Sequence, residues 1–166
     1  TRGVLTSYDG FVRNLDAADD TDFACTLFGR QEQTTVPAAV MQYRGPLSIV
    51  YLRSYPVTNL DQRRFYALAT GEIRAPYLDI ADGLPKNAID GLASYSETAG
   101  CAEVLLSVLP SYVGGQFSED ELLALTDDGI DSVWCMDGVV YHTSDELRLA
   151  ELYQSEDMVY TTEQVK

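Results

Sequence analysis

Two stretches of the chain carry oxygen side chains at spacings that could hold a divalent cation beside a phosphate. Asp79 lies in a loop that closes with Gly83 and Pro85, and further along the chain Glu103 is followed, one helical turn later, by Ser107. Side chains at this spacing project from the same face of a helix. Carboxylate and hydroxyl oxygens are ligands that Mg²⁺ prefers, with waters or phosphates filling its other positions. The spacing therefore predicts a magnesium-binding face on a helix, beside a loop that carries Asp79.

Each of these two elements also has a purely structural interpretation. Glu and Ser at this spacing are common on solvated helices, and Asp at the end of a strand often caps a turn. Within the loop, Asp79 and Asp82 could instead flank a cation or accept a proton from a hydroxyl nucleophile. The residue types alone leave both interpretations open.

The composition indicates one globular domain over residues 1–166. The chain is 46% hydrophobic and 22% charged, which is typical of globular rather than disordered proteins. Its formal net charge of −15, with only two lysines, argues against nucleic acid as a partner because like charges repel. We expect no transmembrane segment, since no apolar run is long enough to span a bilayer, and we find no secretory leader.

The cysteines and the single histidine restrict the possible chemistry. Cys25, Cys101 and Cys135 are an odd number in apolar surroundings and lack zinc-site spacing, which favours buried free thiols over a disulfide with one unpaired cysteine. His142 is the only histidine, so chemistry that needs two histidines is excluded. A serine triad built on His142 would need a nucleophile elbow, and the sequence contains none.

The first half of the chain is expected to form strands. Short apolar runs alternate with turn residues, and Thr70-Gly71 is the centre of one expected hairpin. The expected strands are residues 3–8, 11–13, 23–28, 38–43, 47–53, 65–69 and 72–77.

The second half combines helices with a hairpin. N-cap candidates at 96–98 predict a helix that ends before Pro110, and a capping box at 118–121 opens a second helix through Leu125. The segments 130–136 and 139–142 predict a hairpin, because Asp137-Gly138 supplies the positive φ angles of its turn. Residues 143–146 are expected to cap a third helix. Residues 158–160 are expected to form a short strand. The fold class predicted is α+β, an antiparallel sheet with helices packed on one face.

Several of these stretches resemble the bacterial FAD:protein FMN transferases, the ApbE family of flavinyltransferases. That family carries a His-x-Leu-Asp-Pro-x-Thr-Gly-x-Pro loop and, further on, a helix with Asp-x-x-x-Thr among Ala and Leu. The resemblance runs through most of the chain and matches the C-terminal half of a family member. The matching residues are Leu78-Asp79, Gly83, Pro85, the helix segment 102–107, the hairpin 132–141 and, more faintly, residues 4–12.

The resemblance implies a Mg²⁺-dependent transfer of FMN from FAD onto a Ser or Thr hydroxyl of a partner protein, with release of AMP. Glu103 and Ser107 would hold the metal, and Asp79 would be the catalytic carboxylate. The family is usually found outside the cytoplasmic membrane, so an extracytoplasmic location is expected. The cofactor-binding positions correspond to Asp9, Gly10 and Gly83.

The chain also departs from the family pattern, which supports an alternative function. Ala75-Pro76 stands where the family has its loop histidine, and Asp82-Gly83 replaces Thr-Gly. These changes fit a catalytically inactive relative that acts as a binding or scaffold module and has no cofactor. In such a relative, side chains such as Phe11 or Tyr77 would fill the cleft.

Two further interpretations rest on residue types alone. Thr1 could be an N-terminal threonine nucleophile with its own amine as base. The eleven tyrosines could instead form a surface for protein contacts. Scattered tyrosines are, however, common in sheets.

Overall fold

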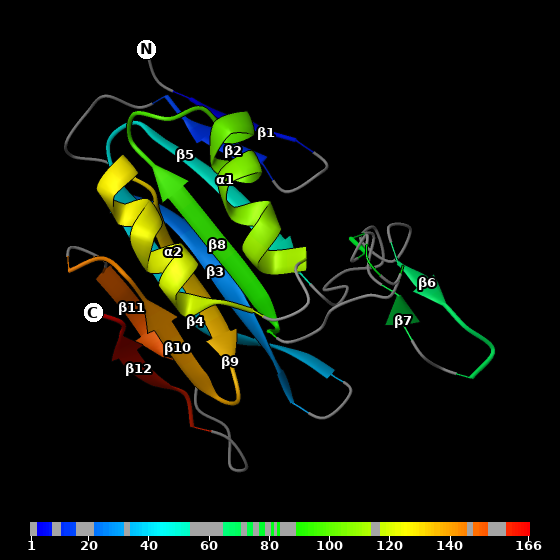
Figure 1. Cartoon of the computed structure of the whole chain (residues 1–166). Coiled ribbons are helices and arrows are strands. Elements are labelled where there is room, and N and C mark those ends of the chain that lie inside the picture. The colour runs from blue at the N-terminus through cyan, green and yellow to red at the C-terminus, as the bar shows by residue number, and fades with distance from the viewer. Residues whose placement is uncertain are drawn as a thin grey trace.

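A seven-stranded sheet forms the middle layer of the protein, between two helices and a second sheet (Figure 1). The structure is a computed structural model, and it describes residues 3–7, 11–15, 22–31, 34–53, 65–70, 73–74, 77–78, 81, 83, 89–113, 117–145, 148–152 and 159–166. In spatial order the strands of the central sheet are β1 (Val4–Thr6), β2 (Phe11–Asn14), β5 (Leu47–Arg53), β8 (Gly91–Ser96), β9 (Asp131–Met136), β10 (Val139–His142) and β12 (Thr161–Gln164). Neighbouring strands are antiparallel except β10 and β12, which are parallel.

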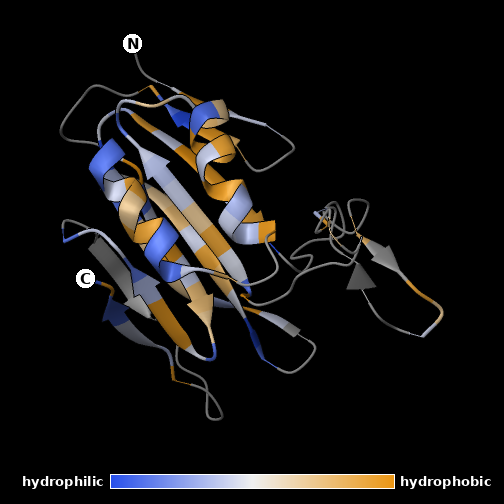
Figure 2. Ribbon diagram, viewed as in Figure 1, coloured by the Kyte–Doolittle hydropathy of each residue, from blue (hydrophilic) through white to orange (hydrophobic). Residues whose placement is uncertain are grey.

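The central strands are buried on both faces, and their alternating side chains join two separate cores. On β5, Leu47 and Ile49 pack toward the second sheet, whereas Val50 and Leu52 pack toward the helices. Figure 2 shows hydrophobic residues along these strands and along the first helix. The predicted α+β class, with helices on one face of an antiparallel sheet, is confirmed.

The second sheet covers the opposite face, and the sequence analysis did not foresee it. Its strands are β3 (Asp22–Gln31), β4 (Thr34–Arg44) and β11 (Arg148–Leu152), in the order β11-β4-β3. Leu27 of β3 and Met41 of β4 are fully buried against the central sheet. The strands expected at 23–28 and 38–43 are therefore confirmed, but they belong to a separate layer.

The third helix expected after residues 143–146 is absent from the described residues there, and Arg148–Leu152 is strand β11 instead. The hydroxyl of Thr143 donates to Asp131 Oδ1 and accepts from the backbone N–H of Ser132, both at 3.0 Å. It is therefore committed to strand β9 and does not cap a helix. Residues 148–152 pair with the edge of β4, so a long-range strand pairing overrides the local helix signal.

Two helices and a 3₁₀ turn pack on the other face of the central sheet. They are α1 (Cys101–Val113), α2 (Glu119–Ala124) and η2 (Leu125–Asp128). Val104 and Val108 of α1 are fully buried against the sheet. Ser118 caps α2 by accepting the N–H of Glu121, as the capping box predicted.

Helix α1 continues past Pro110, so its predicted end was wrong. Proline lacks the N–H that would bond the carbonyl of Leu106, but the Leu106 side chain is 71% exposed, on the side of the helix that water reaches. The last turn is held from the opposite side, where the Ser111 hydroxyl donates to Glu121 Oε2 at 2.6 Å. Buried Tyr112 adds apolar contact there.

Local turn signals identified the hairpins correctly. Asp137 and Gly138 have φ of 50° and 79°, the positive angles that the turn between β9 and β10 requires. The strands expected at 65–69 and 72–77 are described as the short pair β6 (Tyr66–Ala67) and β7 (Ile73–Arg74). The last strand is shifted, because β12 begins at Thr161 rather than Met158. No helix in the described part of the chain is long and apolar enough to cross a membrane.

Burial protects two of the three cysteines from deprotonation. All three cysteines are free thiols, as the sequence predicted. Desolvation raises the pKa of Cys135 to about 12 and that of Cys25 to about 11, because the thiolate is disfavoured away from water.

We expect Cys25 and Cys135 to resist alkylation in the folded protein, since the thiolate is the reactive form. Iodoacetamide at about pH 8, followed by peptide mass spectrometry, should leave both unmodified in native buffer and modify both in guanidinium chloride. Cys101, which is partly exposed like Cys25 and has its Sγ 3.4 Å from the Val12 carbonyl oxygen, serves as the internal comparison. Rapid alkylation of native Cys135 would contradict its burial.

Candidate functional site

Helix α1 carries the two residues that the sequence predicted as metal ligands. Glu103 is exposed in its first turn, and Ser107 follows one turn later in a partly exposed position. The buried residues Val104 and Val108, which directly follow Glu103 and Ser107 in the chain, define the sheet-facing side of the helix. The structure therefore places Glu103 and Ser107 together on one accessible flank of α1.

The Ser107 hydroxyl has a defined orientation on this flank. Its Oγ donates a hydrogen bond to the backbone carbonyl of Glu103 at 3.0 Å. A hydroxyl that donates its hydrogen to a carbonyl keeps its oxygen lone pairs for another partner. One carboxylate and one hydroxyl oxygen, with waters or phosphates in the other positions, match the ligands that Mg²⁺ accepts. The flank therefore supplies two ligands of the type that Mg²⁺ accepts, and waters or substrate phosphates would have to fill its other positions.

Of the other predicted site residues, the structure describes only Gly83. Asp79, Asp9 and Gly10 lie outside the described residues, so the structure does not test their roles. Gly83 is described and exposed, with φ of 67°, a conformation that favours glycine. Within the described ranges, no three His, Cys, Asp or Glu side chains form a group that could hold a metal.

Two aromatic side chains pack against the core that lies beneath α1. Phe11 and Tyr77 both pack against the apolar cluster beneath the helix. The ring of Tyr77 meets the ring of Tyr112 edge-on, with centroids 5.9 Å apart and planes at 89°. This packing is part of the core beneath α1, so the expectation that Phe11 or Tyr77 fills a cleft beside Asp79, Glu103 and Ser107 stays a prediction.

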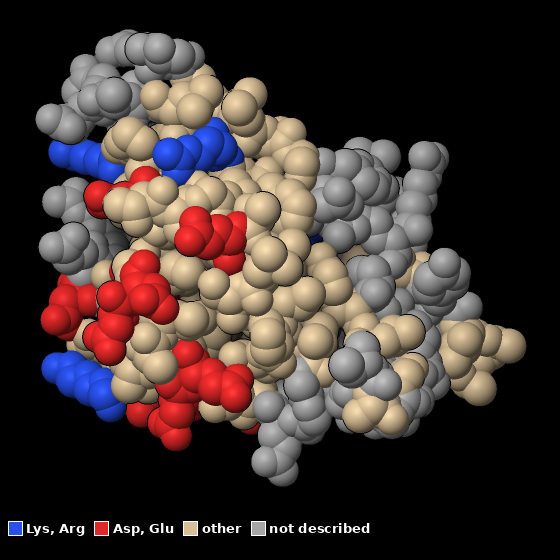
Figure 3. Space-filling model, turned by 45° about the horizontal axis from the view of Figure 1, so that its top comes forward, with Lys and Arg blue, Asp and Glu red and all other residues tan. Residues whose placement is uncertain are grey.

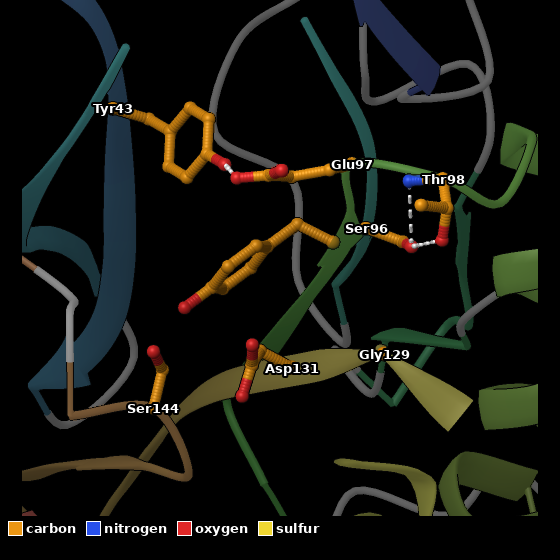
Figure 4. A pocket seen from close by; sticks show the side chains of 8 residues that line it. Tyr43, Ser96, Glu97, Thr98, Gly129, Asp131 and Ser144 are labelled. Atoms are coloured by element: carbon orange, nitrogen blue, oxygen red, sulfur yellow. Dashed lines mark hydrogen bonds between the residues drawn. The ribbon is translucent and has the colours of Figure 1, made fainter. Parts of the chain in front are cut away.

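A separate pocket, which the sequence analysis missed, opens where the two sheets meet near the end of β8 (Figure 4). Its volume is about 220 Å³. It is bounded by the last residues of β4 and β8, the start of β9 and the segment after β10. The lining residues are Tyr43, Tyr95, Ser96, Glu97, Thr98, Gly129, Asp131 and Ser144.

Hydrogen bonds hold the polar wall of this pocket in place. The Tyr43 hydroxyl donates to Glu97 Oε1, which joins β4 to the loop after β8. Ser96 Oγ accepts the N–H groups of Thr98 at 3.3 Å and Ala99 at 3.0 Å, and so fixes the turn that leads into α1. The Glu97 and Asp131 carboxylates are seen on different sides of the pocket in Figure 4.

Sequence reasoning had little means of finding this pocket. Its walls come from four segments that are far apart in the chain and carry no shared motif. One available signal was the polar run 96–98 at the end of an apolar strand. The other is visible only once strands are paired, because Tyr95 and Asp131 are opposite each other in the register of β8 and β9.

Comparison with known proteins shows one structural likeness. The fold is similar to that of the apbe protein from Thermotoga maritima, with a TM-score of 0.51 and 13% sequence identity. The similarity covers 86% of this chain and 41% of that chain, so this chain spans less than half of that protein's length. No protein-family model and no curated protein matches the sequence. The likeness confirms the ApbE-like α+β fold that the sequence resemblance implied.

Proposed function

We propose that this flavinyltransferase-like domain takes part in Mg²⁺-dependent transfer of FMN from FAD to a Ser or Thr hydroxyl of a partner protein. The observation that supports this most directly is the pairing of Glu103 and Ser107 on the accessible flank of α1, with the hydroxyl hydrogen donated to a backbone carbonyl. The shared fold supports the same assignment at a coarser level. We also propose the extracytoplasmic location that the resemblance implied.

In this proposal the chain's own residues bind and orient the reacting groups. The Glu103 carboxylate and Ser107 Oγ would hold the cation on α1. A bound Mg²⁺ supplies positive charge that offsets the negative charge of the FAD pyrophosphate. Asp79 would accept the proton of the attacking hydroxyl. Gly83 and Gly10 would allow the cofactor to approach the backbone closely, and Asp9 would lie beside Gly10 at the same cofactor-binding position.

Replacing Glu103 with alanine is expected to weaken Mg²⁺-dependent FAD binding at least about tenfold, which is about 1.4 kcal/mol. The variant loses the only charged ligand on the flank, whereas Ser107 alone offers a neutral oxygen. Flavin fluorescence, titrated with FAD in the presence of Mg²⁺ or of EDTA, measures the effect. EDTA should weaken binding to the wild type and leave Glu103→Ala unchanged.

Asp120→Ala is the matched control, because Asp120 is also an exposed acidic residue in the first turn of a helix. It should bind FAD as the wild type does, and circular dichroism should show the same fold for both variants. The proposed metal position would be contradicted if the wild type bound FAD as strongly in EDTA as in Mg²⁺, and if Glu103→Ala bound FAD as strongly as the wild type.

The second candidate is a catalytically inactive binding or scaffold module. The specific observation in its favour is the packing of Phe11 and Tyr77 against the apolar cluster beneath α1. In that case the wild type should bind no FAD, with or without Mg²⁺. The same fluorescence titration therefore decides between the two functions.

A further inference from the structure

The pocket between the two sheets has the size of a site for a small terminal group. Pockets that enclose whole cofactors and drug-sized ligands occupy about 300–1,000 Å³. The volume of this pocket is about 220 Å³. A dinucleotide such as FAD is too large for this pocket. The pocket would therefore bind a different and smaller ligand than the α1 flank.

The charge of its lining selects the kind of group. Two carboxylates, from Glu97 and Asp131, line the pocket, and its lining includes no Lys or Arg among the residues that the structure describes. The exposed acidic residues Asp127 and Asp128 come just before Gly129, which is also in the wall. Figure 3 shows Asp and Glu side chains gathered on one side of the molecule in that view. With a net charge of −15, the chain attracts cations and repels anions.

Two aromatic rings form the remaining wall. The rings of Tyr43 and Tyr95 have centroids 6.1 Å apart and planes tilted by 59°. A tyrosine ring face attracts a cation whose centre lies within about 6 Å of the ring centroid. The hydrogen bond from Tyr43 holds Glu97 next to this aromatic wall. A cation in the pocket would thus meet a ring and a carboxylate together.

We propose that this pocket binds a compact organic cation, an ammonium or guanidinium group, between the tyrosine rings and the carboxylates of Glu97 and Asp131. Such a group presents several N–H donors, which the two carboxylates can accept as charge-assisted hydrogen bonds. The hydroxyl oxygens of Thr98 and Ser144 are further acceptors in the lining. The group could be the end of a Lys or Arg side chain of a partner protein, or a free small amine.

An organic cation fits this wall better than a divalent metal does. A metal such as Mg²⁺ or Ca²⁺ needs about six or more oxygen ligands. The described residues here include no group of three metal-binding side chains, and the aromatic rings offer no oxygen lone pair at their faces. A guanidinium is more weakly hydrated than an ammonium and stacks on aromatic faces. We therefore take methylguanidinium as the first probe.

The test is a titration of the isotope-labelled protein with methylguanidinium, followed by amide NMR. We expect shifts at the amides of Thr98, Gly129 and Asp131, with binding in about the millimolar range for so small a probe. Glu97→Gln, which keeps a side-chain oxygen for Tyr43, should weaken binding about tenfold. N-Methylurea has nearly the same shape without the charge, and it should bind at least about tenfold more weakly.

Asp120→Asn is the control variant, since it removes one charge from α2 outside the pocket and should bind as the wild type does. Asp131→Asn is a second test, because asparagine keeps an oxygen for the Thr143 hydroxyl. Equal binding of N-methylurea, unchanged binding by Glu97→Gln, or shifts spread over the acidic surface would each overturn the proposal. A capped Gly-Arg-Gly peptide separates the sources, since tighter binding than methylguanidinium assigns the group to a protein side chain. Weaker binding of the peptide assigns it to a free amine.

Discussion

Replacing Trp134 with alanine is expected to lower the free energy of unfolding by about 3–5 kcal/mol. Trp134 of β9 is fully buried beneath the helices. It stacks on Tyr141, with ring centroids 5.5 Å apart and planes at 14°, and meets Phe117 edge-on at 5.6 Å. Alanine would remove both ring contacts and leave a cavity, because the surrounding sheet and helices can relax only partly to fill it. Whole domains are stable by about 5–15 kcal/mol, so the loss is a large fraction of the total.

Chemical denaturation followed by far-ultraviolet circular dichroism measures this effect, because Trp134 is the only tryptophan and its fluorescence disappears in the variant. Trp134→Phe is the matched comparison and should cost less, since it keeps an aromatic ring. Among the described residues the indole Nε1 has no hydrogen-bond partner, so its removal forfeits no bond there. A cost below about 1 kcal/mol for Trp134→Ala would show that the site is not a packed core.

Gly29→Ala is expected to destabilise the protein by about 1–3 kcal/mol through overpacking. Gly29 of β3 is buried, and a methyl group there would collide with the hydroxyl of Tyr160 and approach its Cζ to 2.8 Å. Tyr160 is only 3% exposed, so its ring has little room to move. Gly100→Ala adds the same methyl group into open space and should cost less than about 1 kcal/mol.

A double-mutant cycle with Tyr160→Phe isolates this contact. The Tyr160 hydroxyl is buried without a hydrogen-bond partner among the described residues, so its removal alone should be close to neutral. The double variant should recover part of the stability lost in Gly29→Ala, since the nearest clashing atom is gone. If the loss of stability in the double variant, measured by chemical denaturation, equals the sum of the losses in the two single variants, the two residues do not touch.

Local signals predicted most of the elements of the fold. The Asp137-Gly138 turn and the Ser118 cap each act over a few neighbouring residues, and each was interpreted correctly. The errors arose where distant segments decide the outcome. Residues 148–152 become a strand because β4 offers an edge, and the separation of β3 and β4 into their own layer depends on which faces they bury.

The candidate sites show the same division. Glu103 and Ser107 were found from sequence because their proximity follows from helical spacing alone. The pocket was missed because Tyr43 and Glu97 meet only after β4 and β8 are placed in different sheets. The roles of Asp79, Asp9 and Gly10 remain predictions.

Strands β11 and β12 belong to different sheets, and this has a consequence for how the protein is made. β11 completes the second sheet beside β4, and β12 completes the central sheet beside β10. β11 and β12 both follow β4 and β10 in the chain, so a nascent chain that has just reached β10 presents the open edges of β4 and β10 at the same time. Open strand edges pair readily with other chains. The interval between synthesis of β10 and synthesis of β12 is therefore when these two edges are open to pairing with other chains.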